Sequence, residues 1–373
     1  MTRDLGVGII GCGNISTAYL RLAPLFRGID VRACADLNLD AAKAQAEAFG
    51  VEALSPNDLM SRDDIEIVVN LTIPAAHAAV SEAALNAGKH VYSEKPFVLD
   101  VADGKRLLAL AEDKGLRIGS APDTILGGAH QLARHLIDQG YLGTILSGTA
   151  VVQGHGMESW HPNPDFFFQP GAGPVLDIGP YYISNLVQLL GPVSEVMAMS
   201  SKGSETRVIG NGPREGEEIP VDTPTTIHAL LRFRSGAQIT LLTSWDVWAH
   251  SHGHMELYGS EGSMFLPDPN FFGGDLRMTR HQQDAALPDW DHPFGQPNEG
   301  ERANYRVAGL ADMAAAIEEG REHRCNGSFA LHVVDVMTSI LTSGETNAPV
   351  ALTTTCDRPS PLGPEQAMAL LKA

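Results

Sequence analysis

The chain has 373 residues, of which 43% are hydrophobic and 19% are charged, a composition typical of a globular protein of about two domains. Its formal net charge of −19, without any cluster of Lys and Arg, argues against nucleic-acid binding, which needs a basic surface. The four cysteines lack C-x-x-C spacing and neither a signal peptide nor a membrane-spanning stretch is visible, so we expect a cytoplasmic protein with no metal site and no membrane contact.

The first third of the chain alternates short apolar runs with helical patterns. Strands are predicted at residues 5–10, 31–35, 65–71, 90–93 and 117–120. Helices are predicted at residues 15–26, 39–49, 75–87 and 101–114. This alternation is typical of βαβ units and therefore of a parallel sheet.

A glycine-rich turn joins the first predicted strand to the first predicted helix. It has the G-x-G-x-x-G/A pattern of dinucleotide-binding proteins, with serine at the third position, and reads Gly11-Cys12-Gly13-Asn14-Ile15-Ser16. Gly11 permits the tight turn, and Gly13 lets the backbone approach a pyrophosphate at the helix N-terminus. We expect residues 11–15 to bind a dinucleotide in a Rossmann domain.

Asp36 ends the second predicted strand, where an acidic residue binds the ribose hydroxyls of NAD. The next residues are Leu37, Asn38 and Leu39, and they offer no arginine to a 2′-phosphate. The sequence therefore predicts NAD rather than NADP as the cofactor, with Asp36 and Leu37 beside it.

Ser93-Glu94-Lys95-Pro96 follows another predicted parallel strand. Ligands of parallel sheets bind outside the carboxyl ends of the strands, so Lys95 is expected next to the nicotinamide. Taken alone, it fits an exposed lysine in a turn better than a catalytic residue.

After about residue 121 the pattern changes to an α+β type with a largely antiparallel sheet. We expect a NAD-binding domain at residues 1–122 and a substrate-binding and oligomerisation domain at residues 123–373. Helices are predicted at residues 128–139, 178–190 and 304–319. Strands are predicted at residues 145–152, 193–200, 225–233, 238–245 and 255–258. Residues 201–223 and 267–301 are predicted to be long surface loops.

Polar and aromatic residues that suit a carbohydrate lie at residues 160–168. We expect His161 and Asp165 to bind substrate hydroxyls, although the aromatic run is equally compatible with core packing. Asp123 and Thr124 follow the last parallel strand and are expected to face the same cleft. Residues 250–254 carry three alternating histidines on a predicted strand, and we interpret that face as exposed or in contact with a partner subunit rather than as a metal site.

At these motifs the chain resembles the glucose-fructose oxidoreductase / inositol dehydrogenase / MocA (Gfo/Idh/MocA) family, from about Leu5 to about Ala316. Besides the glycine turn, the matching elements are Thr72-Ile73-Pro74 with His77, Glu94-Lys95-Pro96, and residues 173–181, Gly-Pro-Val-Leu-Asp-Ile-Gly-Pro-Tyr. The resemblance implies cofactor contacts at Thr72, Ile73, Pro74, His77, Glu94 and Lys95. It implies catalytic and substrate-binding roles for Lys95, Asp177 and Tyr181, a homodimer or homotetramer, and an open antiparallel sheet in the second domain.

Oxidation of an alcohol carbon also requires removal of the hydroxyl proton. Lys95 and Tyr181 are expected to share this task, one taking the proton and the other bonding the alkoxide. We expect burial and the charge of NAD to lower the pKa of Lys95, and Asp177 to lie on one helix face with Tyr181. The predicted function is an NAD-dependent oxidoreductase of a sugar such as an aldose. The alternatives are a cyclitol dehydrogenase, an NAD-dependent glycosidase that oxidises the sugar transiently, and a non-catalytic sensor, which would be expected to lack Lys95 or Asp177.

Overall fold

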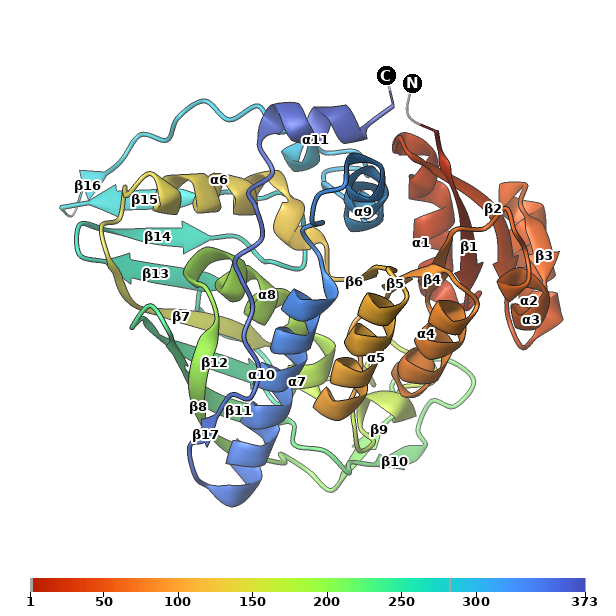
Figure 1. Cartoon of the computed structure of the whole chain (residues 1–373). Coiled ribbons are helices and arrows are strands. Elements are labelled where there is room, and N and C mark those ends of the chain that lie inside the picture. Colours follow the sequence, from red (N-terminus) through yellow and green to blue (C-terminus); the bar gives the residue numbers. More distant parts are fainter. Residues whose placement is uncertain (1–2, 282, 373) are drawn as a thin grey trace.

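The structure, a computed structural model, describes residues 3–281 and 283–372. Within residues 3–281, six parallel strands form a sheet in the order β3-β2-β1-β4-β5-β6, which is the order of a Rossmann sheet (Figure 1). The strands are β1 (Leu5–Ile10), β2 (Ile29–Ala35), β3 (Glu52–Leu54), β4 (Ile67–Asn70), β5 (His90–Ser93) and β6 (Ile118–Ser120). β1 and β4 are buried along their whole length, as expected for apolar strands that are covered on both faces. The predicted parallel N-terminal sheet is confirmed.

The helices that connect these strands begin mostly at short polar side chains that cap the first turn. Asn38 accepts a hydrogen bond from the backbone N–H of Asp40, and Asp100 accepts one from the N–H of Ala102. These helices are α1 (Asn14–Leu22), α2 (Leu39–Phe49), α3 (Pro56–Met60), α4 (His77–Asn86) and α5 (Val101–Asp113). α1 and α4 differ, because no side chain caps their N-termini.

In the described part of the chain, nine strands form a second sheet in the order β16-β15-β14-β13-β7-β12-β11-β8-β17. β7 and β12 are parallel and the other neighbours are antiparallel, which confirms the predicted largely antiparallel sheet. The side chains of β11 alternate between buried and exposed, so the sheet has one core face and one open face. The strands are β7 (Ile145–Gln153), β8 (Val193–Ser201), β11 (Thr226–Phe233), β12 (Gln238–Ser244), β13 (Met255–Gly259), β14 (Gly262–Leu266), β15 (Arg277–Arg280), β16 (Gln283–Asp284) and β17 (Val350–Ala351).

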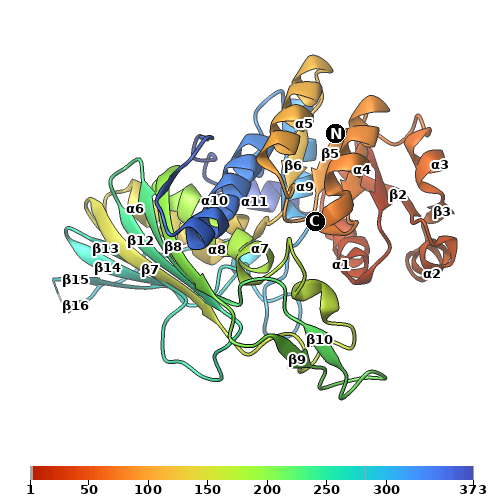
Figure 2. The same cartoon turned by 90° about the horizontal axis from the view of Figure 1, so that it is seen from below.

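Helices cover the core face of the second sheet and leave the opposite face open (Figure 2). They are α6 (Gly128–Asp138), α8 (Gly179–Leu190) and α10 (Gly327–Thr346). α10 contacts β8 and α8, and it also contacts α5 and β6 of the first sheet. α10 therefore packs against elements of both sheets, and these contacts do not mark a boundary between two domains. The boundary between residues 122 and 123 stays a prediction. No helix of residues 3–281 and 283–372 has the length and apolarity needed to span a membrane.

The chain returns to the first sheet at its C-terminal end. α9 (Ala308–Glu319) contacts β6, and α11 (Pro364–Leu370) lies next to the N-terminal segment (Figure 1). The carbonyl of Leu370 accepts a hydrogen bond of 2.8 Å from the N–H of Arg27. This bond fixes α11 against the part of the molecule that contains the first sheet.

Several predicted boundaries were wrong. The helix predicted from residue 304 begins at Ala308, because Val307 has φ +110°, outside the helical region. Residues 250–254 are not a strand, since β13 begins at Met255. The loop predicted at residues 201–223 contains a hairpin of β9 (Thr206–Val208) and β10 (Glu218–Pro220), and the loop predicted at residues 267–301 contains β15 and β16.

Candidate active site

The turn between β1 and α1 has the shape that a phosphate group needs. Gly11 has φ +102°, and a Cβ there would lie 2.6 Å from the carbonyl carbon and oxygen of Leu71. No described atom lies within 4 Å of the place of a Cβ on Gly13. Because α1 also lacks a side-chain cap, its first N–H groups can receive an anion. Residues 11–15 therefore fit the pyrophosphate of a dinucleotide.

Asp36 is held at the edge of this turn. Its Oδ2 accepts a hydrogen bond of 2.8 Å from the N–H of Cys12, and its Oδ1 accepts one of 2.8 Å from the N–H of Asn38. The neighbouring Leu37 is 95% exposed. A fixed carboxylate beside an exposed apolar side chain fits the ribose and adenine of NAD.

Asp36→Ser combined with Leu37→Arg is expected to shift the cofactor preference toward NADP. The change removes the charge that repels a 2′-phosphate and adds a guanidinium that binds it, so the NADP/NAD ratio of kcat/KM should rise at least about tenfold. Steady-state kinetics with both cofactors measures this ratio. Asp40→Ser, which changes an exposed acid four residues away, should leave the ratio unaltered. A wild-type protein that already prefers NADP would contradict the role of Asp36.

The turn after β4 lies beside the glycine turn, since a Cβ on Gly11 would meet the backbone of Leu71 and Thr72. It consists of Thr72, Ile73 and Pro74, and the side chain of Ile73 is 70% exposed. Asn70, which the sequence analysis did not single out, fixes the turn because its buried Oδ1 accepts a hydrogen bond of 2.7 Å from the Thr72 hydroxyl. An exposed apolar side chain at this edge is available to cover a bound dinucleotide.

His77 does not lie on the surface beside this turn. It is fully buried, and its two ring nitrogens lie 2.7 Å and 2.9 Å from the carbonyl oxygens of Pro96 and Thr72. Burial lowers the pKa of His77, so the ring is held neutral. The expectation of a direct cofactor contact is corrected, because this side chain joins the Thr72 turn to the segment after β5.

Glu94 and Lys95 follow β5 and point to different partners. Glu94 Oε1 accepts a hydrogen bond of 3.0 Å from the hydroxyl of Tyr19 in α1, and Oε2 accepts one of 2.9 Å from the N–H of Lys95. Lys95 Nζ donates to the carboxylate Oδ1 and to the carbonyl of Asp177, each at 2.8 Å. The side chains of Lys95 and Asp177 are only 18% and 22% exposed. The structure thus brings together Lys95 from the N-terminal part of the chain and Asp177 from the C-terminal part, both of which were predicted site residues.

The charge on Lys95 is stabilised rather than suppressed. Burial alone would lower the pKa of Lys95, but the Asp177 carboxylate and the nearby Tyr181 raise it above its usual value. In this structure Asp177 and Tyr181 thus oppose the expected lowering by burial, and the lowering expected from the charge of bound NAD stays a prediction. Lys95 is an ammonium that donates hydrogen bonds.

Tyr181 lies beside this ion pair. The Lys95 Nζ is 5.5 Å from the centre of the Tyr181 ring, and the ring is 8% exposed. Asp177 and Tyr181 do not share one helix as expected. Asp177 ends the short helix α7 (Pro174–Asp177), and Tyr181 lies in the first turn of α8 after the break at Ile178.

His161 and Asp165, which were predicted to bind substrate, each contact other residues of the protein. Asp165 forms a two-pronged ion pair with Arg214, with oxygen–nitrogen distances of 2.6 Å and 3.0 Å. His161 Nδ1 accepts a hydrogen bond from the N–H of Asn163, and its ring packs edge-on against Phe166 and Phe167. Among the described residues, no hydrogen bond or ion pair joins His161 or Asp165 to Lys95, Asp177 or Tyr181. Their substrate contacts stay predictions.

Asp123 and Thr124 do not face an open cleft as expected, because their exposed fractions are 2% and 1%. Asp123 Oδ2 instead accepts hydrogen bonds of 2.9 Å and 3.0 Å from the N–H groups of Val307 and Gly309. Burial raises the pKa of Asp123 to about 6, although these hydrogen bonds and Arg306 lower it in part.

Asp123→Asn is expected to raise stability at pH 8 and to flatten its pH dependence. A carboxyl with a raised pKa binds a proton more tightly in the folded state, so its ionisation destabilises the fold as pH rises from about 4 through about 6. Two pKa units correspond to an upper limit of about 3 kcal/mol. Urea unfolding at pH 5 and pH 8 measures the effect. If wild-type protein lost more stability than Asp123→Asn when the pH was lowered from 8 to 5, the raised pKa of the Asp123 carboxyl would be contradicted.

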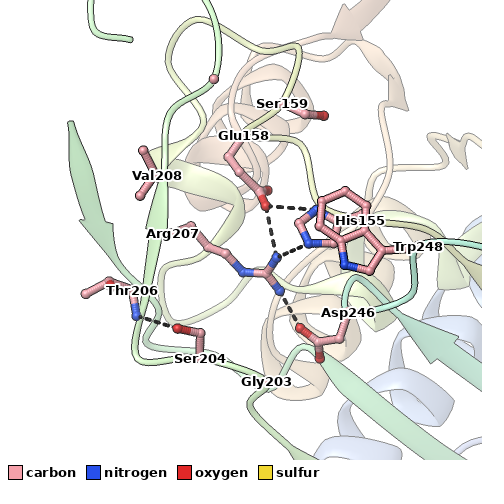
Figure 3. Close-up of a pocket in the computed structure, with 11 residues that line it drawn as sticks. His155, Glu158, Ser159, Gly203, Ser204, Thr206, Arg207, Val208, Asp246 and Trp248 are labelled. Atoms are coloured by element: carbon pink, nitrogen blue, oxygen red, sulfur yellow. Dashed lines mark hydrogen bonds and ion pairs between the residues drawn. The ribbon is translucent and has the colours of Figure 1, made fainter. Parts of the chain in front are cut away.

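An ion-pair network anchors the segment that carries His161 and Asp165 (Figure 3). The guanidinium of Arg207, in β9, lies between the carboxylates of Glu158 and Asp246. His155 stacks on Trp248 with ring centres 3.5 Å apart. These residues line a pocket of about 460 Å³ that contains none of the predicted site residues. The network fixes the start of the segment to the second sheet.

The alternating histidines do not share a strand face. His250 and His252 are exposed, with ring centres 6.1 Å apart, and His254 Nδ1 lies 3.1 Å from the Tyr182 hydroxyl. Within the ranges that the structure describes, no group of three His, Cys, Asp or Glu side chains is placed to hold a metal ion.

Arg306 is a further member of the site that the sequence analysis missed. Its guanidinium carbon lies 6.0 Å from the centre of the Tyr181 ring. The sequence carries no local signal for this residue, because the predicted helix at 304–319 places it within a regular first turn.

Comparison with known proteins agrees with this geometry. Residues 5–121 match a family model described as an oxidoreductase family with an NAD-binding Rossmann fold, and residues 130–265 match a Gfo/Idh/MocA C-terminal domain. The predicted NAD-binding Rossmann domain is thereby confirmed.

Individual relatives cover most of the chain. A dTDP-3,4-didehydro-2,6-dideoxy-alpha-D-glucose 3-reductase from Streptomyces violaceoruber is 31% identical over 270 residues, 71% of this chain and 73% of the relative. A levoglucosan dehydrogenase from Pseudarthrobacter phenanthrenivorans is 28% identical over 293 residues, 70% of this chain and 73% of that enzyme. Among solved structures, an NAD binding oxidoreductase from Klebsiella pneumoniae has a TM-score of 0.81 at 23% identity, over 94% of this chain and 99% of the other, which confirms the fold.

Proposed function

The chain belongs to the Gfo/Idh/MocA family of NAD-binding oxidoreductases, and on that premise we propose that it transfers hydride between NAD and a hydroxyl-bearing carbon of a sugar or related polyol. The observation that carries this proposal is the meeting of Lys95, Asp177 and Tyr181 at the carboxyl edge of the first sheet. The phosphate-binding turn opens at the same edge, so cofactor and substrate would meet beside one ammonium group.

The cofactor would be held by residues 11–15 at its pyrophosphate, by Asp36 and Leu37 at its adenosine half, and by the turn of Thr72, Ile73 and Pro74. When bound, NAD supplies the acceptor or donor of the hydride. Glu94 supports the arrangement, since it fixes the N–H of Lys95 and the hydroxyl of Tyr19 in place.

We assign different proton roles to the two central side chains. Asp177 keeps Lys95 as an ammonium, and such a group donates a hydrogen bond to the substrate oxygen but does not take its proton. Tyr181 is then the group that accepts the hydroxyl proton in oxidation and returns it in reduction. Asp177 orients Lys95 through two contacts of 2.8 Å.

The substrate class rests on the relatives and on the segment at residues 160–168. The names of the relatives describe a levoglucosan dehydrogenase and a dTDP-sugar reductase, both of which act on carbohydrate rings. In this chain Trp160 and Phe166 are 57% and 54% exposed, and they flank His161. Exposed aromatic rings beside hydrogen-bonding side chains suit the apolar face and the hydroxyls of a sugar.

A substrate screen tests the proposed function. Wild-type protein and the Lys95→Ala variant are incubated with NAD and a panel of aldoses, cyclitols and sugar acids, and NADH absorbance is followed. NADH formation with at least one compound, lost in the variant, is expected. Cleavage of an aryl glycoside without accumulation of NADH would instead identify a glycosidase, and no reaction with any compound would contradict the proposal.

We further propose a cytoplasmic homo-oligomer that assembles through the open face of the second sheet. Met197, Met199 and Leu230 lie on neighbouring strands of that face and are 48%, 68% and 56% exposed. All four cysteines are free thiols, as is usual in a reducing compartment. Light scattering should report a dimer or tetramer that dissociates in a Met199→Lys/Leu230→Lys variant, and a monomeric wild type would contradict the assembly.

A further inference from the structure

We propose that Arg306 is a positioning residue that promotes proton transfer by the Tyr181 hydroxyl, an inference that rests on the proton role assigned to Tyr181 in the proposed function. Arg306 and Lys95 place two positive charges beside one phenol ring, at 6.0 Å and 5.5 Å from its centre. Tyr181 is largely shielded from water, so charges at these distances act on it more strongly than they would in solvent.

The positive charge of Arg306 is not neutralised by a directly bound carboxylate, so it can act on Tyr181. Its N–H groups donate to the backbone and side-chain oxygens of Asn270 at 3.2 Å and 2.9 Å, and to Asn304 Oδ1 at 3.5 Å. None of its donors meets a carboxylate among the described residues. Burial lowers the pKa of Arg306, but Tyr181, Asp123 and Glu94 raise it above its usual value. Glu299 in the same loop also interacts with the charge of Arg306, which contributes to lowering the pKa of Glu299. Neutral amide oxygens thus hold the guanidinium in place without cancelling its charge.

The backbone next to Arg306 is strained. Val307 has φ +110°, a conformation that a β-branched residue rarely adopts. The buried carboxylate of Asp123 stabilises this conformation, since it accepts hydrogen bonds from the N–H groups of Val307 and Gly309. Strain of this kind persists where the surrounding structure imposes it, and it is concentrated at functional sites.

A second contact fixes the same loop to the cofactor-binding half. Glu299 forms an ion pair of 2.6 Å with Arg21 of α1, and its other carboxylate oxygen accepts a hydrogen bond of 2.6 Å from Asn304. The loop that carries Arg306 is therefore held at two places. One is Arg21 of α1, and the other is Asp123, in the segment after β6. This placement sets the distance between Arg306 and Tyr181.

The effect of Arg306 on the reaction follows from charge. In oxidation, the O–H bond of the substrate breaks and its proton passes to the Tyr181 phenolate, while NAD, when bound, would supply the acceptor of the hydride. A neighbouring guanidinium stabilises the negative charge of a phenolate relative to the neutral phenol. Removal of the Arg306 charge is therefore expected to disfavour proton transfer to Tyr181.

The test compares Arg306→Gln with wild type and with the matched control Arg302→Gln. Arg302 is an exposed arginine of the same loop that packs on Phe271. The acidic limb of the pH profile of kcat/KM is expected to move up by about one pH unit or more in Arg306→Gln, with kcat at neutral pH about tenfold lower and recovery at high pH. Arg302→Gln should match wild type, and Arg306→Lys, which keeps the charge, should restore most of the profile.

A second readout does not depend on turnover. Tyrosinate absorbance is titrated in each protein, and the contribution of Tyr181 is obtained by subtracting the same titration of Tyr181→Phe. That contribution should appear at higher pH in Arg306→Gln than in wild type. If Arg306→Gln does not fold, Asn270→Ala, which releases the guanidinium, should give a smaller shift in the same direction. Unchanged titration in these variants would overturn the role of Arg306, whereas a wild-type protein inactive on every sugar would count against the proposed function alone.

Discussion

Replacing Lys95 with alanine is expected to lower kcat by about 10³-fold. The variant loses the ammonium that donates a hydrogen bond to the substrate oxygen, and it leaves the Asp177 carboxylate without its partner at 2.8 Å. The Kd for NAD should change less than about fivefold, since the glycine turn and Asp36 are untouched. Single-turnover kinetics gives the first quantity, and calorimetric titration with NAD gives the second.

The matched control is Lys105→Ala, an exposed lysine of α5 whose Nζ contacts only the Thr353 hydroxyl at 3.5 Å in the described structure. It should retain wild-type kcat. A Lys95→Ala variant with near-normal kcat would exclude Lys95 from the chemistry, and a variant that binds no NAD would show that the loss is not specific to the chemical step.

Tyr181→Phe is expected to lower kcat by about 10²–10³-fold. The ring and its packing remain, but the hydroxyl that exchanges the substrate proton is absent. The remaining activity should lose the pH dependence that the wild-type protein shows in its acidic limb. The pH profile of kcat/KM for both proteins measures this difference.

Tyr182→Phe is a control at the next position of α8. Its hydroxyl lies 3.1 Å from His254 Nδ1 and 3.3 Å from Asp268 Oδ1, away from Lys95. This variant should lose about 1 kcal/mol of stability and keep its kcat. An equal fall in kcat for both variants would indicate a general disturbance of α8 rather than a proton role for Tyr181.

The first sheet was predictable because its signals are local. Apart from β3, each strand is a short, mostly apolar run bounded by turn residues, and the glycine turn has its own pattern. β3 was not predicted, because it has only three residues and one of them is an exposed glutamate. α10 was not predicted, because it is buried on most of its surface and so shows no polar stripe with helical period. The cap at Asn326, whose side chain accepts a hydrogen bond from the N–H of Phe329, was the available signal for its start.

Only those residues of the site that belong to local sequence motifs were predictable. The placement of Lys95 and Asp36 follows from strand ends, which is a rule of parallel sheets. The raised pKa of Lys95 depends on Asp177, 82 residues away, and the position of Arg306 depends on a strained valine that no propensity scale favours. Charge balance in a site is set by such distant contacts, which the sequence motif around Lys95 does not show.

The most direct measurement is a crystal structure of the protein with NAD and a sugar that supports turnover. We expect the pyrophosphate at residues 11–15, the nicotinamide ring beside the Lys95 ammonium, and a substrate hydroxyl between Lys95 Nζ and the Tyr181 hydroxyl. A dinucleotide bound elsewhere, or a nicotinamide that points away from Lys95 and Tyr181, would contradict it.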